Sequence, residues 1–314
     1  MTQARRFEFT VTEGEARMRL DLYLAAHKRV ATRSQVQRWI EAGRVKVDGV
    51  PARRSGAALR AGQCVEVAAP SEAPRRVEAE DIPLDILHED PELLVINKPA
   101  GLVVHPAPGN WSGTLVNAIL HKLGGVEAGF DEQRPGIVHR LDKDTSGVLL
   151  IARDVATHGR LAAMFQKRQV AKQYLALVWG RVRHARGIIR QPIGRHPTER
   201  KRMTVRTGGR EALTRYEVVE RFKRATLVRA YPETGRTHQI RVHLASIGHP
   251  IVADAAYGGR RRERPLPIER QALHAEAIEI EHPDSGARVR FTAPLPDDFR
   301  GALAALRAES ESAA

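Results

Sequence analysis

The most informative stretch of the chain reads His139-Arg140-Leu141-Asp142-Lys143-Asp144-Thr145-Ser146-Gly147. Apolar residues flank this 139–147 loop, with Ile137-Val138 before it and residues 148–151 after it. Nine residues between two strands predicted to be buried therefore hold two acids, two bases, a histidine and two hydroxyls. Loops held by rigid strands often carry the chemistry of a protein. The composition alone favours a charged surface turn, with residues 144–147 as turn formers.

A calcium loop is a second interpretation of the same residues. Asp142, Asp144, Ser146 and Gly147 match positions 1, 3, 5 and 6 of the EF-hand pattern. Position 12 of that pattern is a bidentate glutamate, and here it is Arg153. The residues in between are apolar rather than ligands, so we reject a calcium site.

The N-terminal part of the chain predicts a small separate domain over residues 16–68. Leu20, Tyr23 and Leu24 recur at helical spacing, and residues 32–35 match a capping box that begins a second helix. Residues 45–49 predict a strand that enters an Asp-Gly turn, and residues 63–68 alternate as a second strand does. Two helices and a small hairpin sheet are expected.

The rest of the chain predicts an α+β catalytic domain with a mostly antiparallel mixed sheet over residues 83–303. Residues 69–82 are rich in proline and charge and predict a linker, and residues 304–314 predict a flexible tail. Helices are expected at 113–123, 155–168 and 237–247. The expected strands are 93–97, 147–152, 172–179, 213–219, 226–231, 275–281 and 288–292.

Charge and composition narrow the class of protein. The 314 residues carry a net charge of +14, which favours a polyanionic partner. One cysteine, Cys64, excludes an internal disulfide framework and a cysteine-based zinc site. No apolar run reaches the roughly 20 residues that span a bilayer, and residues 1–10 lack a signal-peptide core. We therefore expect a cytoplasmic protein without a membrane partner.

Four ordered motifs resemble the RluA-type family of RNA pseudouridine synthases, and the N-terminal unit resembles an S4 RNA-binding domain. Together the resemblance covers nearly all of residues 16–300, which makes it far more specific than any single motif. One departure is Ala255, where relatives usually have proline after the aspartate. The motifs are Arg134-Pro135-Gly136-Ile137-Val138-His139-Arg140-Leu141-Asp142-Lys143-Asp144-Thr145-Ser146-Gly147, Asn97-Lys98-Pro99-Ala100-Gly101-Leu102-Val103-Val104-His105-Pro106, Lys172-Gln173-Tyr174-Leu175-Ala176 and Gly235-Arg236-Thr237-His238-Gln239-Ile240-Arg241.

The resemblance implies isomerisation of uridine to pseudouridine within RNA, by one aspartate acting on a flipped-out nucleotide and with no cofactor. It implies Asp142, the first aspartate of the loop, as the catalytic carboxylate, with Asp144 ordering the turn. Whether Asp142 attacks the sugar or removes the proton from C2′ stays open. The resemblance also assigns Tyr174, Arg241 and Arg140 to the active site.

Elementary chemistry gives each of these residues a role and an alternative. A carboxylate in an enclosed pocket needs a cation, and Arg241 lies beside the apolar stripe of its helix. A tyrosine face suits stacking on uracil, and a planar guanidinium at Arg140 suits the gap left by an extruded base. The alternatives are a solvated Arg241, a core Tyr174 and a surface Arg140.

Clustered basic residues predict where RNA is held. Residues 195–210 contain six basic residues and one acid, although charge runs are often only solvated faces. Because aromatic residues make up only 5% of the chain, we expect phosphate contacts more than base stacking. The predicted RNA-binding residues are Arg33, Arg38, Lys46, Arg53, Lys98, Arg200, Lys201 and Arg202.

The predicted partner is large-subunit (23S) ribosomal RNA or its precursor particle, because the resemblance is strongest to members that modify it. The helix 69 stem-loop is the implied target, and a monomer is expected. Two alternatives remain: a non-catalytic assembly factor, which leaves the acidic loop unexplained, and a nucleoside hydrolase, which needs a second acid near Asp142. No metal site is predicted, because His238 and His243 are five residues apart rather than four.

Overall fold

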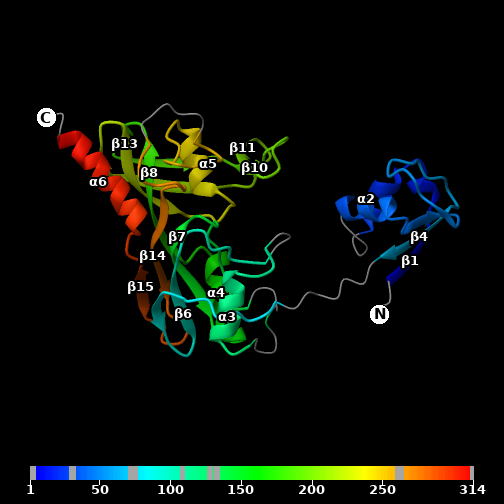
Figure 1. Ribbon diagram of the computed structural model, residues 1–314, viewed down its shortest axis with the longest axis horizontal. Helices are drawn as coiled ribbons and strands as arrows, with labels where there is room; N and C mark the ends of the chain where they lie inside the picture. Colours follow the sequence, from blue (N-terminus) through cyan, green and yellow to red (C-terminus); the bar gives the residue numbers. More distant parts are fainter. Residues whose placement is uncertain are drawn as a thin grey trace. The chain divides into compact units, whose positions relative to one another are not determined.

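The structure is a computed structural model that describes residues 5–27, 33–69, 77–106, 110–125, 130, 135–258 and 265–311. The chain forms two compact units, Met1–Arg75 and Arg76–Ala314, each of which is drawn in Figure 1. Within the described ranges, no helix is both long and apolar enough to cross a membrane.

The first unit packs two helices on a four-stranded antiparallel sheet of order β1-β4-β2-β3. Leu20, Tyr23 and Leu24 are buried, as their helical spacing predicts, and pack with Val36 and Ile40 of the second helix. The Asp-Gly turn between β2 and β3 forms as predicted, and both of its central residues have positive φ. Strand β1 lies before the predicted domain boundary at residue 16. The elements are β1 (Arg5–Thr10), a 3-10 turn (Glu13–Glu15), α1 (Leu20–Ala26), α2 (Arg33–Glu41), β2 (Val45–Val47), β3 (Val50–Pro51) and β4 (Cys64–Ala69).

The second unit is built on one mixed sheet of order β5-β6-β7-β14-β8-β13-β12-β9, with β15 paired to β14. Every pairing in the described sheet is antiparallel except β7 with β14, which confirms the predicted fold class. The seven predicted strands form within two residues of their predicted ends, while β5 and β9 had no prediction. The strands are β5 (Ile86–Glu89), β6 (Leu93–Lys98), β7 (Ser146–Ala152), β8 (Ala171–Trp179), β9 (Arg186–Arg190), β12 (Leu213–Arg221), β13 (Ala225–Pro232), β14 (Leu273–Glu281) and β15 (Arg288–Thr292).

Strand β7 is buried along its whole length, because helices cover both faces of the sheet around it. Leu149 and Ile151 pack with α3 (Leu115–Lys122), whereas Leu150 packs with α4 (Val155–Gln166). The strand therefore starts from a fixed position, and the 139–147 loop that leads into it is anchored to the centre of the unit.

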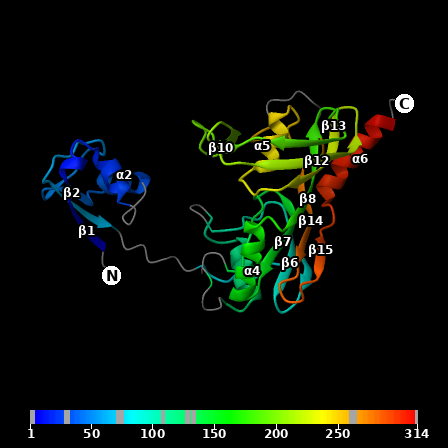
Figure 2. The same ribbon diagram turned by 180° about the vertical axis from the view of Figure 1, so that it is seen from behind.

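Two further helices, α5 (Gln239–Ser246) and α6 (Asp297–Glu311), lie on opposite sides of the β8, β13 and β12 part of the sheet (Figures 1 and 2). The prediction of a flexible tail from residue 304 is wrong for residues 304–311, which are the second half of α6. Phe299, Leu303 and Leu306 are buried in the core. Each such side chain contributes about 1.5–3 kcal/mol, which holds an otherwise Ala/Glu/Ser-rich segment helical.

The linker prediction is also wrong in part. Residues 70–76 lie outside the described residues, but residues 77–82 are docked on the start of α3. Asn117 donates from its side-chain amide to the Glu78 carbonyl at 2.7 Å, and the Glu80 carboxylate accepts from the Gly113 N–H at 3.0 Å. This stretch belongs to the second unit.

Candidate active site

The 139–147 loop enters β7 at a glycine that no other residue can replace. Gly147 has φ +114°, and a Cβ atom there would lie 2.2 Å from the carbonyl oxygen of Ala275 on β14. Gly136, before the loop, has φ +66° and would place a Cβ 2.0 Å from the Ala152 carbonyl oxygen. Close backbone contacts at both ends therefore fix where the loop begins and ends.

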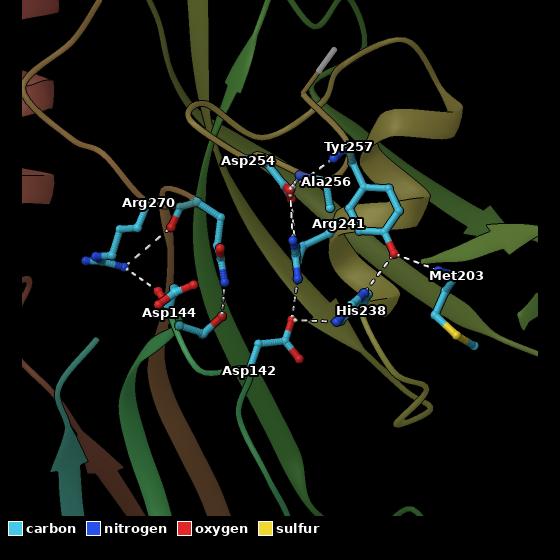
Figure 3. A network of polar contacts seen from close by, with 11 residues as sticks. Asp142, Asp144, Met203, His238, Arg241, Asp254, Ala256, Tyr257 and Arg270 are labelled. Atoms are coloured by element: carbon cyan, nitrogen blue, oxygen red, sulfur yellow. Dashed lines mark hydrogen bonds and ion pairs between the residues drawn. The ribbon is translucent and has the colours of Figure 1, made fainter. Parts of the chain in front are cut away.

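Two cations, the buried Lys98 and the partly buried Arg270, hold the backbone of the loop. Lys98, on β6, donates from Nζ to the carbonyl oxygens of Lys143 at 2.8 Å, Pro99 at 2.7 Å and Leu102 at 3.0 Å. Arg270 donates to the Asp144 carbonyl at 3.0 Å, as Figure 3 shows. Asp144 therefore helps to fix the loop through its backbone carbonyl group.

The prediction that Lys98 contacts RNA is wrong, because its side chain is fully buried and occupied by these three carbonyls. Burial lowers the pKa of Lys98 to about 8, against the opposing effect of the Asp144 carboxylate. Its role is to brace the loop.

A Lys98→Met substitution is expected to destabilise the second unit by about 2 kcal/mol or more, because buried carbonyls lose a charged donor. Urea unfolding measures this change. Lys143→Met is the matched control. Lys143 provides one of the three carbonyls, but its own side chain is exposed and should not be needed for stability. Equal unfolding midpoints for the two variants would contradict the bracing role.

Asp142 and Arg241 meet directly, although 99 residues separate them in the chain. Arg241 Nη1 donates to Asp142 Oδ2 at 3.0 Å, while its Nε and Nη2 donate to the two carboxylate oxygens of Asp254 at 2.7 and 2.8 Å (Figure 3). Burial alone would lower the pKa of Arg241, but the carboxylates of Asp254 and Asp142 outweigh it and raise the pKa. Arg241 is therefore a fixed cation between two acids.

Asp254 is in turn held by the backbone that follows it. Its Oδ1 accepts the N–H groups of Ala256 at 2.9 Å and Tyr257 at 3.1 Å, and its side chain is fully buried. The departure at Ala255 therefore leaves intact the turn that positions the carboxylate.

His238 lies beside Asp142. The Met203 N–H donates to the Tyr257 hydroxyl at 2.9 Å, and the hydroxyl oxygen lies 2.7 Å from His238 Nδ1 (Figure 3). His238 Nε2 lies 3.9 Å from Asp142 Oδ2. Burial lowers the pKa of His238, which favours the neutral imidazole beside the carboxylate.

Asp142, Arg241 and His238 line one cavity of about 610 Å³, together with Tyr174 and Arg140. Tyr174 is half-buried on β8, where it packs against both large core clusters of the unit. Burial raises the pKa of Tyr174, and the Asp142 carboxylate raises it further, so the hydroxyl stays protonated. Arg140 is exposed at the cavity wall. The structure thus brings Asp142, Tyr174, Arg241 and Arg140 around one space.

The predicted RNA-binding residues fall into several settings. Arg38, Lys46 and Arg53 are exposed on the first unit, while the side chain of Arg33 lies outside the described residues. A hairpin of β10 (Ile193–Arg195) and β11 (Met203–Val205) presents exposed Arg200 and Lys201 at its turn.

Arg202 makes contacts with both the hairpin and a residue next to the site. It pairs with Glu199 at 2.9 Å, and its guanidinium lies 5.4 Å from the centre of the Tyr257 ring. Since Tyr257 also hydrogen-bonds His238, the basic hairpin is connected to the residues around Asp142.

Among the residues that the structure describes, one group of side chains could hold a metal ion: His88, Asp90 and His282, which do not line the cavity. Asp90 Oδ2 lies 2.5 Å from His88 Nε2 and 3.1 Å from His282 Nε2. The N–H groups of Asp284 and Ser285 point at His282 Nδ1 at 3.3 and 3.4 Å, which leaves its proton on Nε2. A metal would need the lone pair of that nitrogen, so this cluster fits a hydrogen-bonded clamp better than a metal site.

Sequence reasoning missed Asp254 and His238 as parts of this site. His238 belongs to the motif at residues 235–241, and Asp254 precedes Ala255, where the chain departs from its relatives. The contacts of these two residues with Asp142 and Arg241 join distant parts of the chain, so no local sequence pattern predicts them.

Comparisons with known proteins show the family to which the chain belongs. The family model described as RNA pseudouridylate synthase matches residues 92–246, and the S4 domain model matches residues 18–63. A ribosomal large subunit pseudouridine synthase D of Nitrosomonas europaea is 44% identical over 308 residues, covering 96% of this chain and 88% of the relative. The enzyme of the same name from Escherichia coli strain K12 is 40% identical and covers 99% of this chain and 97% of the relative.

Solved structures agree. The human RNA pseudouridylate synthase domain containing 1 protein has a TM-score of 0.56 at 30% identity, covering 69% of this chain and 86% of that one. The human domain containing 4 protein has a TM-score of 0.55 at 26% identity, covering 71% of this chain and 93% of that one. The chain is therefore an RNA pseudouridine synthase: it belongs to the RNA pseudouridylate synthase family and carries an N-terminal S4 domain.

Proposed function

We propose that this enzyme converts uridines of large-subunit ribosomal RNA to pseudouridine, with the helix 69 stem-loop as its target and Asp142 as the reacting carboxylate. The relatives named as ribosomal large subunit pseudouridine synthases match nearly the full chain, including its S4 domain. A stem-loop suits the cavity, because a loop nucleotide leaves its stack at a lower cost than a nucleotide in a duplex.

The observation that carries the proposal is the contact of Asp142 with buried Arg241 inside a cavity that Tyr174 also lines. In the reaction the N1–C1′ bond breaks and its electron pair stays on the uracil. In one route an Asp142 carboxylate oxygen adds to C1′, and this C1′–O bond breaks when C5 of the turned base bonds to C1′. In the other route Asp142 removes the C2′ proton as the base leaves and returns it to C2′ when C5 bonds to C1′. In both routes C5 then loses its proton and N1 gains one, so the product is an isomer.

A second free acid would favour hydrolysis instead, as paired carboxylates do in glycosidases. Among the described residues that line the cavity, the only other carboxylate is that of Glu233. Glu233 pairs with Arg215 at 2.9 Å. Asp254 is engaged on both oxygens by Arg241. This arrangement supports isomerisation by one carboxylate.

The experiment uses transcripts of large-subunit ribosomal RNA, incubated with the full chain and no added cofactor. Pseudouridine is then mapped by position. We expect conversion within the helix 69 stem-loop and none in a transcript from which that stem-loop is deleted. Conversion only at other positions would overturn the helix 69 assignment, and binding without any conversion would overturn the catalytic proposal in favour of an assembly factor.

We also propose that exposed Arg200 and Lys201 of the hairpin turn contact RNA phosphates. Replacing both with glutamine should weaken RNA binding and lower the slope of log affinity against log salt by about 1.4–1.8 units. The conversion rate at saturating RNA should stay near that of the parent. Affinity measured between about 50 and 200 mM salt tests this.

Lys223→Gln is the control for this pair, because Lys223 is an exposed lysine in the turn between β12 and β13. It should leave the salt slope unchanged. An unchanged slope in the Arg200→Gln/Lys201→Gln variant as well would remove the hairpin from the binding surface. The same measurement on Arg38→Gln/Lys46→Gln tests the S4 domain.

A further inference from the structure

A second cation lines the cavity, and the reaction described above does not use it. Lys172 lies on β8 and is half-buried, and it shares the cavity with Asp142 and Tyr174. The one hydrogen bond found for Nζ in the described structure is long, at 3.5 Å to the carbonyl oxygen of Thr234. Within that part of the chain, no carboxylate forms an ion pair with Lys172 or offsets its burial.

An ammonium in this setting is costly to the fold. Burial lowers the pKa of Lys172 to about 8, with no opposing carboxylate. Lys98 is buried too, but three carbonyls satisfy all three of its donors. Lys172 has two donors left over and a cavity in front of it, which is the arrangement expected of a group that meets a ligand.

We propose that Lys172 is a catalytic residue whose ammonium donates a hydrogen bond to a ring oxygen of the uracil while the base is detached from the ribose. The inference rests on the proposed reaction and deepens it by naming the group that holds the base.

The position of Lys172 on the strand supports this contact. Residues two apart in a strand point to the same face and lie about 6.7 Å apart. Lys172 and Tyr174 therefore face the cavity together. Gln173, between them, bonds Glu276 and Arg290 away from the cavity. A uracil ring stacked on Tyr174 presents its edge within reach of a lysine side chain on the neighbouring position.

His139 lies close enough to Lys172 to be affected by its charge, and other groups hold the His139 ring. His139 accepts the Leu150 N–H at Nε2 at 2.9 Å and stacks on Phe165 with ring centres 4.8 Å apart. Burial, and then the Lys172 charge, lowers the pKa of His139 to about 3, so this ring is neutral. The ammonium is left to interact with whatever enters the cavity.

The chemistry gives that ammonium a partner only during the reaction. When the N1–C1′ bond breaks, the electron pair on N1 spreads over the ring onto O2 and O4. A cation fixed at one of these oxygens stabilises the negative charge as it develops, which is the most effective way to use a preorganised donor. When C5 bonds to C1′ and N1 is protonated, the ring is neutral again and Lys172 keeps its proton throughout.

A phosphate is the competing ligand for Lys172, and the observations favour the base. Arg140 and Arg168 also line the cavity and are exposed, as expected for contacts with a backbone at the rim. Lys172 is more deeply placed than either of them.

The test compares Lys172→Met with Lys172→Arg in single-turnover conversion of the parent RNA substrate, with thermal unfolding to verify that both fold. The methionine variant should lose about 100-fold in rate at saturating RNA, with RNA affinity within about twofold of the parent. The arginine variant should recover most of the rate. Loss of affinity with a lower salt slope and an unchanged saturated rate would overturn the proposal in favour of a phosphate contact.

Alkaline pH provides a second readout. Nine titratable or charged groups share the cavity with Lys172 from other elements: His105, His139, Arg140, Asp142, Arg168, Glu233, Arg236, His238 and Arg241. Lys172→Arg retains all of them, so its comparison with the parent isolates residue 172. The parent should lose more kcat/KM than the arginine variant as the pH rises through about 8, because Lys98 titrates in this range in both proteins and Lys172 only in the parent. Identical pH profiles would contradict the proposal.

If the parent itself makes no pseudouridine, the proposed function fails, whereas conversion unaffected by Lys172→Met defeats only this inference.

Discussion

Asp142→Asn is expected to bind RNA as the parent does and to convert no uridine. The amide nitrogen is not nucleophilic and takes up no proton from C2′, so either role of the carboxylate is lost. Asn keeps the shape of the side chain, and its carbonyl oxygen still accepts from Arg241 Nη1. Binding measured by filter retention and conversion measured by product digestion should therefore separate completely.

Asp144→Asn is the matched control, because it makes the same change two residues along the loop. The backbone carbonyl oxygen of residue 144, which accepts from Arg270, is unaffected by this change. We expect conversion within a few-fold of the parent. Equal loss of conversion in both variants, or residual conversion above about 1% in Asp142→Asn, would contradict the assignment of Asp142.

Asp254→Asn is expected to cost both stability and activity. Asp254 is fully buried and bonds Arg241 through both oxygens, so the substitution leaves a buried guanidinium partly unpaired. Breaking such a pair costs about 3–5 kcal/mol. The arginine would then turn toward Asp142 and lose its fixed position, so conversion should fall at least tenfold. Denaturant unfolding and single-turnover conversion measure the two effects.

Tyr257→Phe tests the hydroxyl group of Tyr257 separately from its aromatic ring. It removes the hydroxyl that bonds His238 and Met203 while keeping the ring that lies 5.0 Å from the Arg241 guanidinium. We expect a smaller loss of stability than for Asp254→Asn. Wild-type stability in Asp254→Asn would show that Arg241 does not depend on Asp254.

The sheet could be predicted from the sequence because its strands are either apolar runs or alternate between apolar and polar residues, with turn residues between them. Residues 147–152 are apolar without alternation, and β7 is covered on both faces. The short edge strands β5 and β9 have few buried residues and hence little hydrophobic pattern. The end of the chain was misjudged by composition, although Phe299, Leu303 and Leu306 have the spacing of a buried helical face.

The site could be predicted only in part, for a related reason. Motif likeness gave Asp142, Tyr174, Arg241 and Arg140, and the structure places all four around one cavity. Burial of a polar side chain has no sequence pattern, so Lys98 was expected on the surface. Its three carbonyl partners depend on the path of the loop in space.

The most direct test of the account follows two labels in one uridine of the RNA, a carbon label in the uracil ring and tritium on C5. If one carboxylate detaches the base and C5 rejoins the sugar, tritium enters water in equal amount to the pseudouridine formed, and the ring carbon stays in the RNA. Ring carbon released as free uracil, or tritium retained on C5 while product forms, would contradict the account.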